Sequence, residues 1–135
     1  STPLAEHHSE LYGTLGEALL VPHLSYVGAM KAVRGRIKAA AHITGGGLIE
    51  NVPRALPDGL GANFDTTTWS LPPVFSILLE RTNISREEAY RVFNMGLGLV
   101  LVCDRKYATE IEALVEGARV VGEVYSATGE QRVTL

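Results

Sequence analysis

The sequence predicts an α/β (α+β) domain in which a mixed β-sheet is flanked by helices. Segments with alternating apolar and polar residues take turns along the chain with segments whose apolar residues recur at helical spacing. Such alternation indicates a sheet with helices packed on it. The last two strand-like segments, 119–125 and 132–135, are close enough in sequence to form a hairpin, so we expect the sheet to be mixed. At 135 residues and 46% apolar composition, the chain can bury one core.

The first half of the chain predicts a helix, a strand and a second helix. Apolar residues at near-helical spacing predict the first helix over 26–33, and alternation predicts the strand over 37–43. Apolar residues on one helical face predict the second helix over 48–56. Pro53 cannot lie deep in a regular helix. Either this helix is short and kinked, or Asn51 caps a second short turn.

The second half continues the alternation. β-favouring residues predict a strand over 59–69, and Pro72-Pro73 suits the start of a helix over 73–81. The "SREE" capping box predicts a helix through Phe93, and the apolar run "LGLVLVC" predicts a buried strand over 97–103. A final helix over 107–115 ends near a glycine.

Residues 1–14 are polar and begin without Met, and we expect them to be partly loose. This start suggests a piece of a longer protein or a processed end. Residues 15–135 are expected to form one domain.

Composition argues against several classes of partner. The net charge is −3 and basic residues are scattered, so we expect no nucleic-acid binding. No apolar run approaches the roughly 20 residues that span a bilayer, so we expect no membrane partner. The lone Cys103 forms no internal disulfide, which fits a reducing compartment. The histidines lack metal-ligand spacing, so we expect no metal site.

The stretch "HITGGG" carries the main candidate site. Where a strand passes into a helix, the glycines of Thr44-Gly45-Gly46-Gly47 let backbone N–H groups approach an anion at the helix N-terminus. A tight turn that merely needs positive φ is the alternative, and one glycine would satisfy it. His42, at the strand end, is either a structural residue or a functional one. The stretch lacks the P-loop spacing, and no Lys follows. Asn94–Gly98 is a second glycine turn, which an ordinary helix C-cap explains.

Longer motifs carry a resemblance to a known family. The strings "LGEALL.P", "AHITGGGLIENVPRALP.GLGA", "W..P..F..L" and "EEAYRVFNMGLGLVLV" are similar to the C-terminal domain of aminoimidazole ribonucleotide (AIR) synthetase, also called phosphoribosylformylglycinamidine cyclo-ligase. The match runs from about Leu15 to Glu123. Relatives such as selenophosphate synthetase carry an Asp-containing version of the glycine turn, so "HITGGG" favours the cyclo-ligase.

The resemblance implies an ATP-dependent ring closure in purine biosynthesis. It implies ATP and Mg²⁺ as cofactors, both bound mainly by an N-terminal ATP-binding domain that this chain lacks. It also implies a small phosphorylated substrate, a homodimer and a cytoplasmic location for the full-length protein. The active site would lie in the cleft between the two domains, and this fragment would be inactive alone.

The resemblance also assigns roles to particular residues. His42 would be catalytic, and the substrate or phosphate would be bound by Thr44, Gly45, Gly46, Gly47, Asn94 and Gly96.

The chain departs from the family at "PHLSYV", where His23–Ser25 replace the usual Thr-Arg-Ile. Two alternatives therefore stay open. One is a domain of another ATP-using member, similar to formylglycinamidine ribonucleotide synthetase, selenophosphate synthetase or thiamine-phosphate kinase. The other is a degenerate, non-catalytic domain for dimerisation or ligand sensing.

Overall fold

The structure is a computed structural model, and it describes residues 3–135. Its helices are α1 (Leu15–Leu19), α2 (Val27–Ala32), α3 (Gly47–Ala55), α4 (Pro73–Arg81), α5 (Arg86–Val92) and α6 (Ala108–Leu114). Its strands are β1 (His7–His8), β2 (Gly13–Thr14), β3 (Ile37–His42), β4 (Leu60–Phe64), β5 (Leu99–Cys103), β6 (Gly122–Ser126) and β7 (Val133–Thr134). Two short 3₁₀ turns are η1 (Ser9–Leu11) and η2 (Arg105–Tyr107). From α2 onward, the order of helices and strands is the predicted one.

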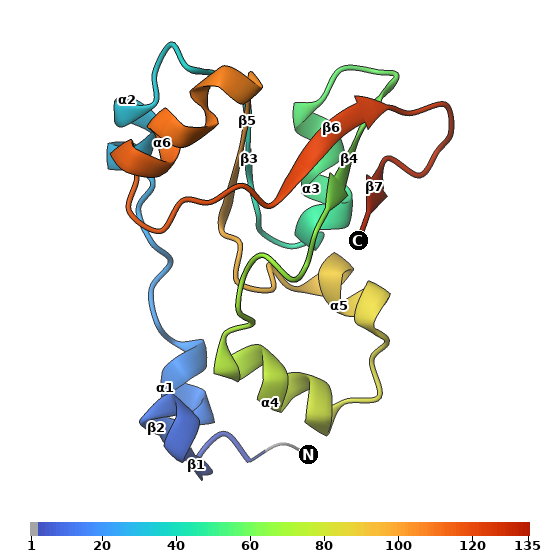
Figure 1. Ribbon diagram of the computed structural model, residues 1–135. Helices are drawn as coiled ribbons and strands as arrows, with labels where there is room; N and C mark the ends of the chain where they lie inside the picture. The colour runs from blue at the N-terminus through green and yellow to red at the C-terminus, as the bar shows by residue number, and fades with distance from the viewer. Residues whose placement is uncertain (1–2) are drawn as a thin grey trace.

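The strands from β3 onward form two separate sheets (Figure 1). Strands β3 and β5 pair antiparallel, with His42 opposite Leu99. In the other sheet β4 is central, antiparallel to β6 and parallel to β7, so this sheet is mixed as predicted. The predicted hairpin between the last two strands is wrong, because β6 and β7 flank β4. The Arg132 side chain donates to the carbonyls of Leu56, Pro57 and Leu60 and so holds the last segment on the far edge of β4.

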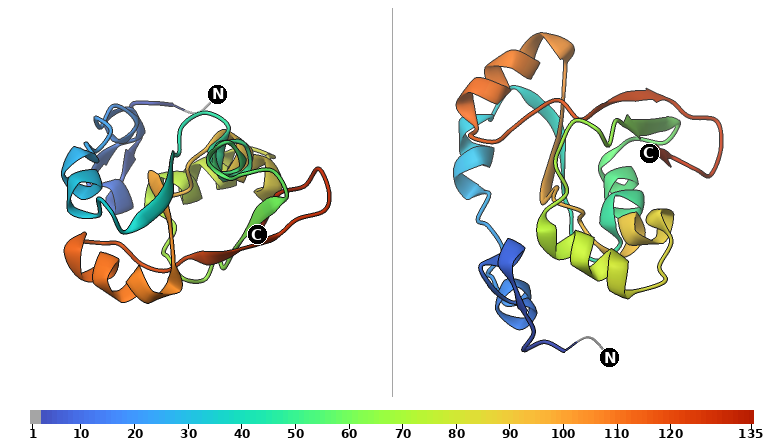
Figure 2. Two further views of the ribbon diagram at one scale, coloured as in Figure 1. Left: turned by 90° about the horizontal axis from the view of Figure 1, so that it is seen from above. Right: turned by 60° about the horizontal axis from the view of Figure 1, so that its bottom comes forward.

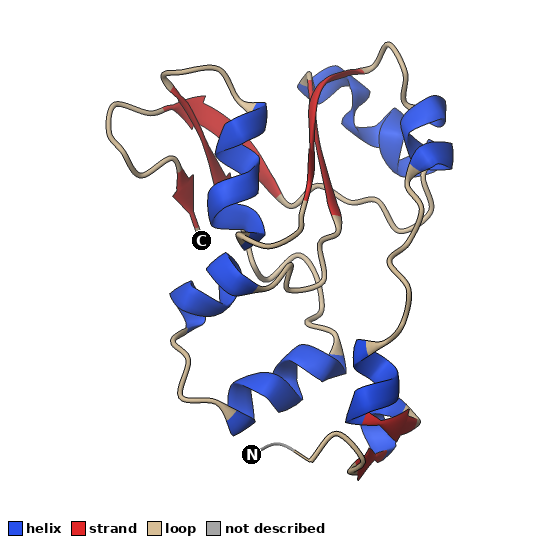
Figure 3. Cartoon of the chain, turned by 180° about the vertical axis from the view of Figure 1, so that it is seen from behind, coloured by secondary structure: helices blue, strands red, loops and turns tan. Residues whose placement is uncertain are grey.

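Helix α3 connects the two sheets physically. It packs against β3, β4, β7 and α5, and the view from behind shows it between the two groups of strands (Figure 3). Its apolar face supplies much of the core, whose largest fully buried members in this region are Ile43, Leu48, Val52 and Met95. Burial of such side chains stabilises the fold by about 1.5–3 kcal/mol each. The start of α3 is therefore held on a rigid base.

Strand β4 is shorter than the sequence predicts. The predicted strand ran to Trp69, but β4 ends at Phe64. The Asp65 carboxylate accepts hydrogen bonds from the backbone N–H and the hydroxyl of Thr67, at 3.0 and 2.6 Å. This local side-chain turn competes with the strand for the backbone. Trp69 then turns inward as a core residue.

Residues 3–14 form two short strands and a 3₁₀ turn ahead of α1. Strands β1 and β2 pair antiparallel, and the Thr14–Glu17 capping box begins α1. The Glu6 carboxylate pairs with Arg81 at the end of α4, which ties this unit to the rest of the chain. Figure 2 shows the unit joined to α2 by an extended segment. None of the helices described for 3–135 is long and apolar enough to cross a membrane.

Candidate functional site

The two glycine turns meet at one end of the β3–β5 pair. Because the strands are antiparallel, the end of β3 lies beside the start of β5. The N–H of Ile43 donates to the carbonyl of Gly98 at 2.9 Å, just beyond the last paired residues. The turn at Thr44–Gly46 and the turn at Asn94–Gly98 are therefore neighbours. The structure thus brings together the residues that the sequence singled out.

The three consecutive glycines do different things. Gly46 and Gly47 have φ of +100° and +54°, in the left-handed region that side chains rarely adopt. A Cβ on Gly47 would also lie 1.9 Å from the carbonyl oxygen of Tyr90. Gly45 has no positive φ, and a Cβ there would meet nothing within 4 Å. The fold therefore requires two of the glycines, and only Gly45 is left without a structural reason.

Asn51 orients the turn from within the helix. Its side-chain nitrogen donates to the carbonyls of Thr44, Gly45 and Gly47, at 3.3, 3.1 and 2.9 Å. The suggestion that Asn51 caps a second short turn is wrong, because α3 runs continuously through Pro53. Asn51 is 8% exposed and is the only buried polar side chain of 3–135. Sequence reasoning missed this role, because "LIEN" gives no sign that the amide reaches back by one turn.

The turn leaves backbone donors unused. Within residues 3–135, the N–H groups of Gly45 and Gly46 donate no hydrogen bond, whereas that of Gly47 donates to Thr44. Their carbonyl oxygens are held by Asn51 or by the first turn of α3. Unpaired N–H groups at a helix N-terminus are the arrangement that proteins use to bind phosphate or carboxylate oxygens. Gly45 is exposed and Gly46 partly so, so a ligand can reach both.

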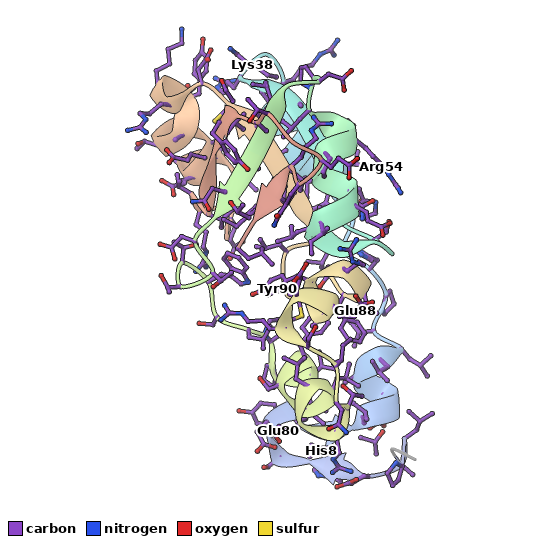
Figure 4. The ribbon with its side chains drawn as sticks, turned by 90° about the vertical axis from the view of Figure 1, so that its right-hand side faces the viewer. His8, Lys38, Arg54, Glu80, Glu88 and Tyr90 are labelled. Carbon is purple, nitrogen blue, oxygen red and sulfur yellow. The ribbon has the colours of Figure 1, made fainter. Side chains whose placement is uncertain are left out.

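Glu50 occupies the space beside these donors. A Cβ on Gly46 would lie 2.8 Å from the Glu50 carboxylate, so this side chain folds back over the turn. The carboxylate is 3.7 Å from both Arg54 and Arg91. Arg54 projects outward from α3 (Figure 4) and is 69% exposed. An anion bound at Gly45 and Gly46 would thus compete with Glu50 for the helix end, and the two guanidinium groups are near enough to join it. Sequence reasoning missed Arg91, because it lies on another helix.

The second turn is held by its own residues. The side-chain oxygen of Asn94 accepts from the N–H of Gly96 at 3.0 Å, an Asx-type turn. Trp69 donates its indole N–H to the carbonyl of Met95 at 3.0 Å. Gly96 has φ of +95°, and Pro72 packs where its side chain would be. Asn94 and Gly96 therefore have structural roles in this turn, and the contacts hold the loop beside the first turn.

His42 lies in a cluster of three rings. It is exposed at the end of β3, with its ring centroid 4.9 Å from that of His23 and 5.8 Å from that of Tyr26. The rings meet edge to face, a favourable arrangement for aromatic pairs. Burial raises the pKa of the Tyr26 hydroxyl above its ordinary value of 10.0. His23 belongs to the stretch that departs from the family pattern. Sequence reasoning missed its contact with His42, and this departure was the only feature of the sequence that drew attention to His23.

A groove adjoins the ring cluster. It has a volume of about 670 Å³, and its lining comes mainly from the segment 24–34, with Ala40, His42 and Leu99. Lys31 and Arg34 are the basic residues of this lining. This volume is within the range of small-molecule sites, about 300–1,000 Å³. No group of three or more His, Cys, Asp or Glu side chains in 3–135 is placed to hold a metal ion. The site can therefore offer anion donors, an imidazole and cations.

Comparison with known proteins agrees with the motifs. The family profile described as "AIR synthase related protein, C-terminal domain" matches residues 1–134. A relative from Geobacillus sp. (strain WCH70), named phosphoribosylformylglycinamidine cyclo-ligase, is 45% identical over 121 residues, covering 85% of this chain and 35% of the relative. One of the same name from Lachnospira eligens (strain ATCC 27750 / DSM 3376 / VPI C15-48 / C15-B4) is 40% identical over 140 residues, covering 98% of this chain and 40% of the relative. The chain thus spans about 35–40% of the length of these curated relatives. Because the profile covers almost every residue, the chain belongs to the family of AIR synthase related C-terminal domains.

Proposed function

We propose that this chain is the C-terminal part of a phosphoribosylformylglycinamidine cyclo-ligase, an ATP-dependent ligase of purine biosynthesis. The observation that carries the proposal is the match over nearly the whole chain to relatives of that name. Within "HITGGG", the N–H groups of Gly45 and Gly46 are unused among residues 3–135. The reaction closes formylglycinamidine ribonucleotide to aminoimidazole ribonucleotide. The amide oxygen attacks the γ-phosphorus of ATP and ADP leaves. An amidine nitrogen then attacks the activated carbon, a proton is lost, and phosphate departs with the former amide oxygen.

The turn residues supply charge stabilisation in this proposal. The N–H groups of Gly45 and Gly46 contact a phosphate or the amide oxygen, and Thr44 and Gly47 fix the turn that presents them. His42 polarises or orients the amide from the adjacent strand end. Donors held rigidly before the reaction stabilise developing charge without the cost of reorganising solvent. Asn94 and Gly96 form the neighbouring wall, and the side-chain nitrogen of Asn94 faces no partner among residues 3–135.

Other parts of the site belong to the longer protein. ATP supplies the phosphoryl group, and the unused N–H groups fit one of its phosphates. The residues described here do not fit Mg²⁺ on their own. We assign ATP and Mg²⁺ binding mainly to an N-terminal domain, since the relatives extend well beyond the matched region. The full-length protein is proposed to be a cytoplasmic homodimer, and this chain to be inactive alone.

The test is turnover by the longer protein that carries this chain. His42→Ala should lower kcat about 100-fold, the effect of losing one preorganised donor. His7→Ala, which changes another exposed histidine, is the matched control and should leave turnover unchanged. The thermal midpoint of the His42→Ala variant should stay near that of the parent, because His42 is exposed. Equal turnover in the two variants would remove His42 from the mechanism.

A non-catalytic ligand-sensing domain is the second candidate. The observation that favours it is the Glu50 carboxylate, which folds over the helix end that a phosphate would use. Titration of the longer protein with ATP and with the ribonucleotide separates the two. Ligand binding without any turnover would favour sensing, and turnover would reject it.

A further inference from the structure

A second pocket is lined by residues of α4, of α5 and of the loop that follows β4. Figure 1 shows the two helices below the strands, with this loop descending to α4. The pocket has a volume of about 350 Å³, near the lower end of the range of small-molecule sites, about 300–1,000 Å³. Most of its lining is apolar or aromatic: Trp69, Leu71, Leu79, Ile84, Tyr90 and Met95. Thr66 and Arg86 complete the lining, which contains no acidic residue among those of 3–135.

Arg86 is a cation of this pocket without a carboxylate partner. Its guanidinium group donates to the Thr66 hydroxyl and lies 5.9 Å from the centroid of the Tyr90 ring. It forms no ion pair within residues 3–135. A guanidinium group has five N–H donors in a planar fork that matches a carboxylate, so donors remain for a ligand. The pocket therefore combines apolar walls with one positive charge that is held in place.

Tyr90 adds an unpaired hydroxyl to the same lining. The residue lies on α5 (Figure 4) and is only 4% exposed. Its hydroxyl forms no hydrogen bond with another group of residues 3–135. The hydroxyl oxygen is not completely enclosed, so a molecule in the pocket can reach it. Because buried polar groups are normally paired, this hydroxyl is suited to a bound ligand.

We propose that this pocket binds a small monocarboxylate that has an apolar or aromatic body. The carboxylate accepts hydrogen bonds from Arg86 and from the Tyr90 hydroxyl, and the body packs on the half-buried leucines Leu71 and Leu79. A phosphate dianion would meet only one cation in this lining. Trp69 donates to the carbonyl of Met95, which fixes one wall before binding and lowers the cost of ordering it. The inference goes beyond the proposed function, in which neither Arg86 nor Tyr90 has a role.

Titration with phenylacetate tests the ligand class. Calorimetry on the longer protein that carries this chain should show saturable binding at one site. Phenylacetamide has the same shape without the charge and should bind at least about tenfold more weakly. Inorganic phosphate has no apolar body and should not compete at constant ionic strength. The proposal is wrong if phenylacetate does not saturate, if the amide binds equally well or if phosphate competes.

Substitutions test the two polar residues. Arg86→Gln should weaken phenylacetate binding at least about tenfold, and Tyr90→Phe, which keeps the buried ring, about threefold to tenfold. Arg34→Gln is the matched control, because Arg34 is also exposed and without an ion pair in 3–135 but lines the groove beside His42. It should change binding by less than about twofold. Parent-like binding in both pocket variants, or a larger loss in Arg34→Gln than in Arg86→Gln, would overturn the proposal.

Two further measurements locate the ligand. Trp69 is the single tryptophan of the 135-residue chain and lines the pocket, so its fluorescence should change as phenylacetate saturates that chain. Unchanged fluorescence at saturation would place the ligand elsewhere and overturn the proposal. ATP and formylglycinamidine ribonucleotide should not displace phenylacetate from the longer protein, and displacement would assign the probe to the site of the glycine turns instead. Turnover tests the proposed function separately, since its absence with phenylacetate bound as expected rejects only that function.

Discussion

The side-chain nitrogen of Asn51 donates a 2.9 Å hydrogen bond to the carbonyl oxygen of Gly47, one turn earlier in the same helix. The same nitrogen reaches the carbonyls of Thr44 and Gly45. One buried amide thus gathers three carbonyls on the inner side of the turn. The unused N–H groups of Gly45 and Gly46 owe their arrangement to this contact.

Replacing Asn51 should destabilise the fold. Asn51→Ala leaves three carbonyls without this donor and should lower the free energy of unfolding by about 1–3 kcal/mol. Asn51→Asp should cost more, because a carboxylate would face those oxygens. Denaturant unfolding measures both. Asn83→Ala, at an exposed asparagine, should stay within about 0.5 kcal/mol of the parent. An Asn51→Ala variant as stable as the Asn83→Ala variant would show that the contact contributes nothing.

The glycines should differ sharply in their tolerance of a methyl group. Gly47→Ala combines an unfavourable φ with a backbone clash and should lower the free energy of unfolding by more than about 3 kcal/mol. Gly45→Ala should change it by less than about 1 kcal/mol, because the space is open and φ is ordinary. In the longer protein, Gly45→Ala should still lower turnover, since the methyl group crowds the approach to the unused N–H groups. Full turnover in that variant would contradict the anion-binding role.

Gly98 should be coupled to Tyr26. A Cβ on Gly98 would lie 1.9 Å from the Tyr26 hydroxyl and 2.9 Å from its Cζ. Gly98→Ala should therefore cost about 1–3 kcal/mol and displace the ring from His42. Tyr26→Phe removes the nearest atom, so a double-mutant cycle should show a favourable coupling above about 0.5 kcal/mol. Gly28→Ala, where a Cβ meets nothing within 4 Å, is the control. Strict additivity of the two changes would refute the contact.

Acid should weaken the ion pairs that join β3 to the segment after β5. Lys38 donates to Asp104 at 2.7 Å, and this hydrogen bond lowers the pKa of Asp104 below its ordinary 3.8. Arg36 likewise lowers the pKa of Glu110 below 4.5. A carboxyl with a depressed folded pKa stabilises the protein above its ordinary pKa, and this stabilisation is lost as pH falls through the folded value. Because all four groups are substantially exposed, each pair contributes little.

The Lys38 pair can be isolated by substitution. Lys38→Met should lower the thermal midpoint slightly at pH 7, and the difference from the parent should shrink as pH falls below 3.8. Lys31→Met, which removes a lysine without an ion pair in 3–135, should show no such pH dependence. A difference in thermal midpoint that stays constant from pH 7 to pH 3 would mean that Lys38 does not lower the pKa of Asp104.

Much of the fold could be predicted because its causes are local. Apolar spacing in 26–33 and alternation in 37–43 gave the correct elements, and Pro73 and Ser85 marked the starts of α4 and α5. The prediction of a hairpin between the last two strands was wrong for a non-local reason. Both β6 and β7 pair with β4 instead of with each other, and the Arg132 side chain adds hydrogen bonds to carbonyls more than 70 residues away.

The candidate site likewise has features that the sequence predicted and features that only the structure shows. "HITGGG" identified by itself a glycine turn between a strand and a helix, and its flanking residues identified the family. The sequence did not show why three glycines stand together. Gly47 meets the backbone of α5, which packs there only after folding.

The sequence by itself therefore determined the order of the elements from α2 onward, the family and the place of the glycine turn. These depend on interactions within a few residues and on the order of residue types. Only the tertiary structure decided that His23 contacts His42, that Glu50 lies over the turn and that six large apolar side chains of residues 19–30 stay exposed. The physical reason is that each depends on which surfaces pack together, a balance of burial over the whole chain that no short stretch encodes.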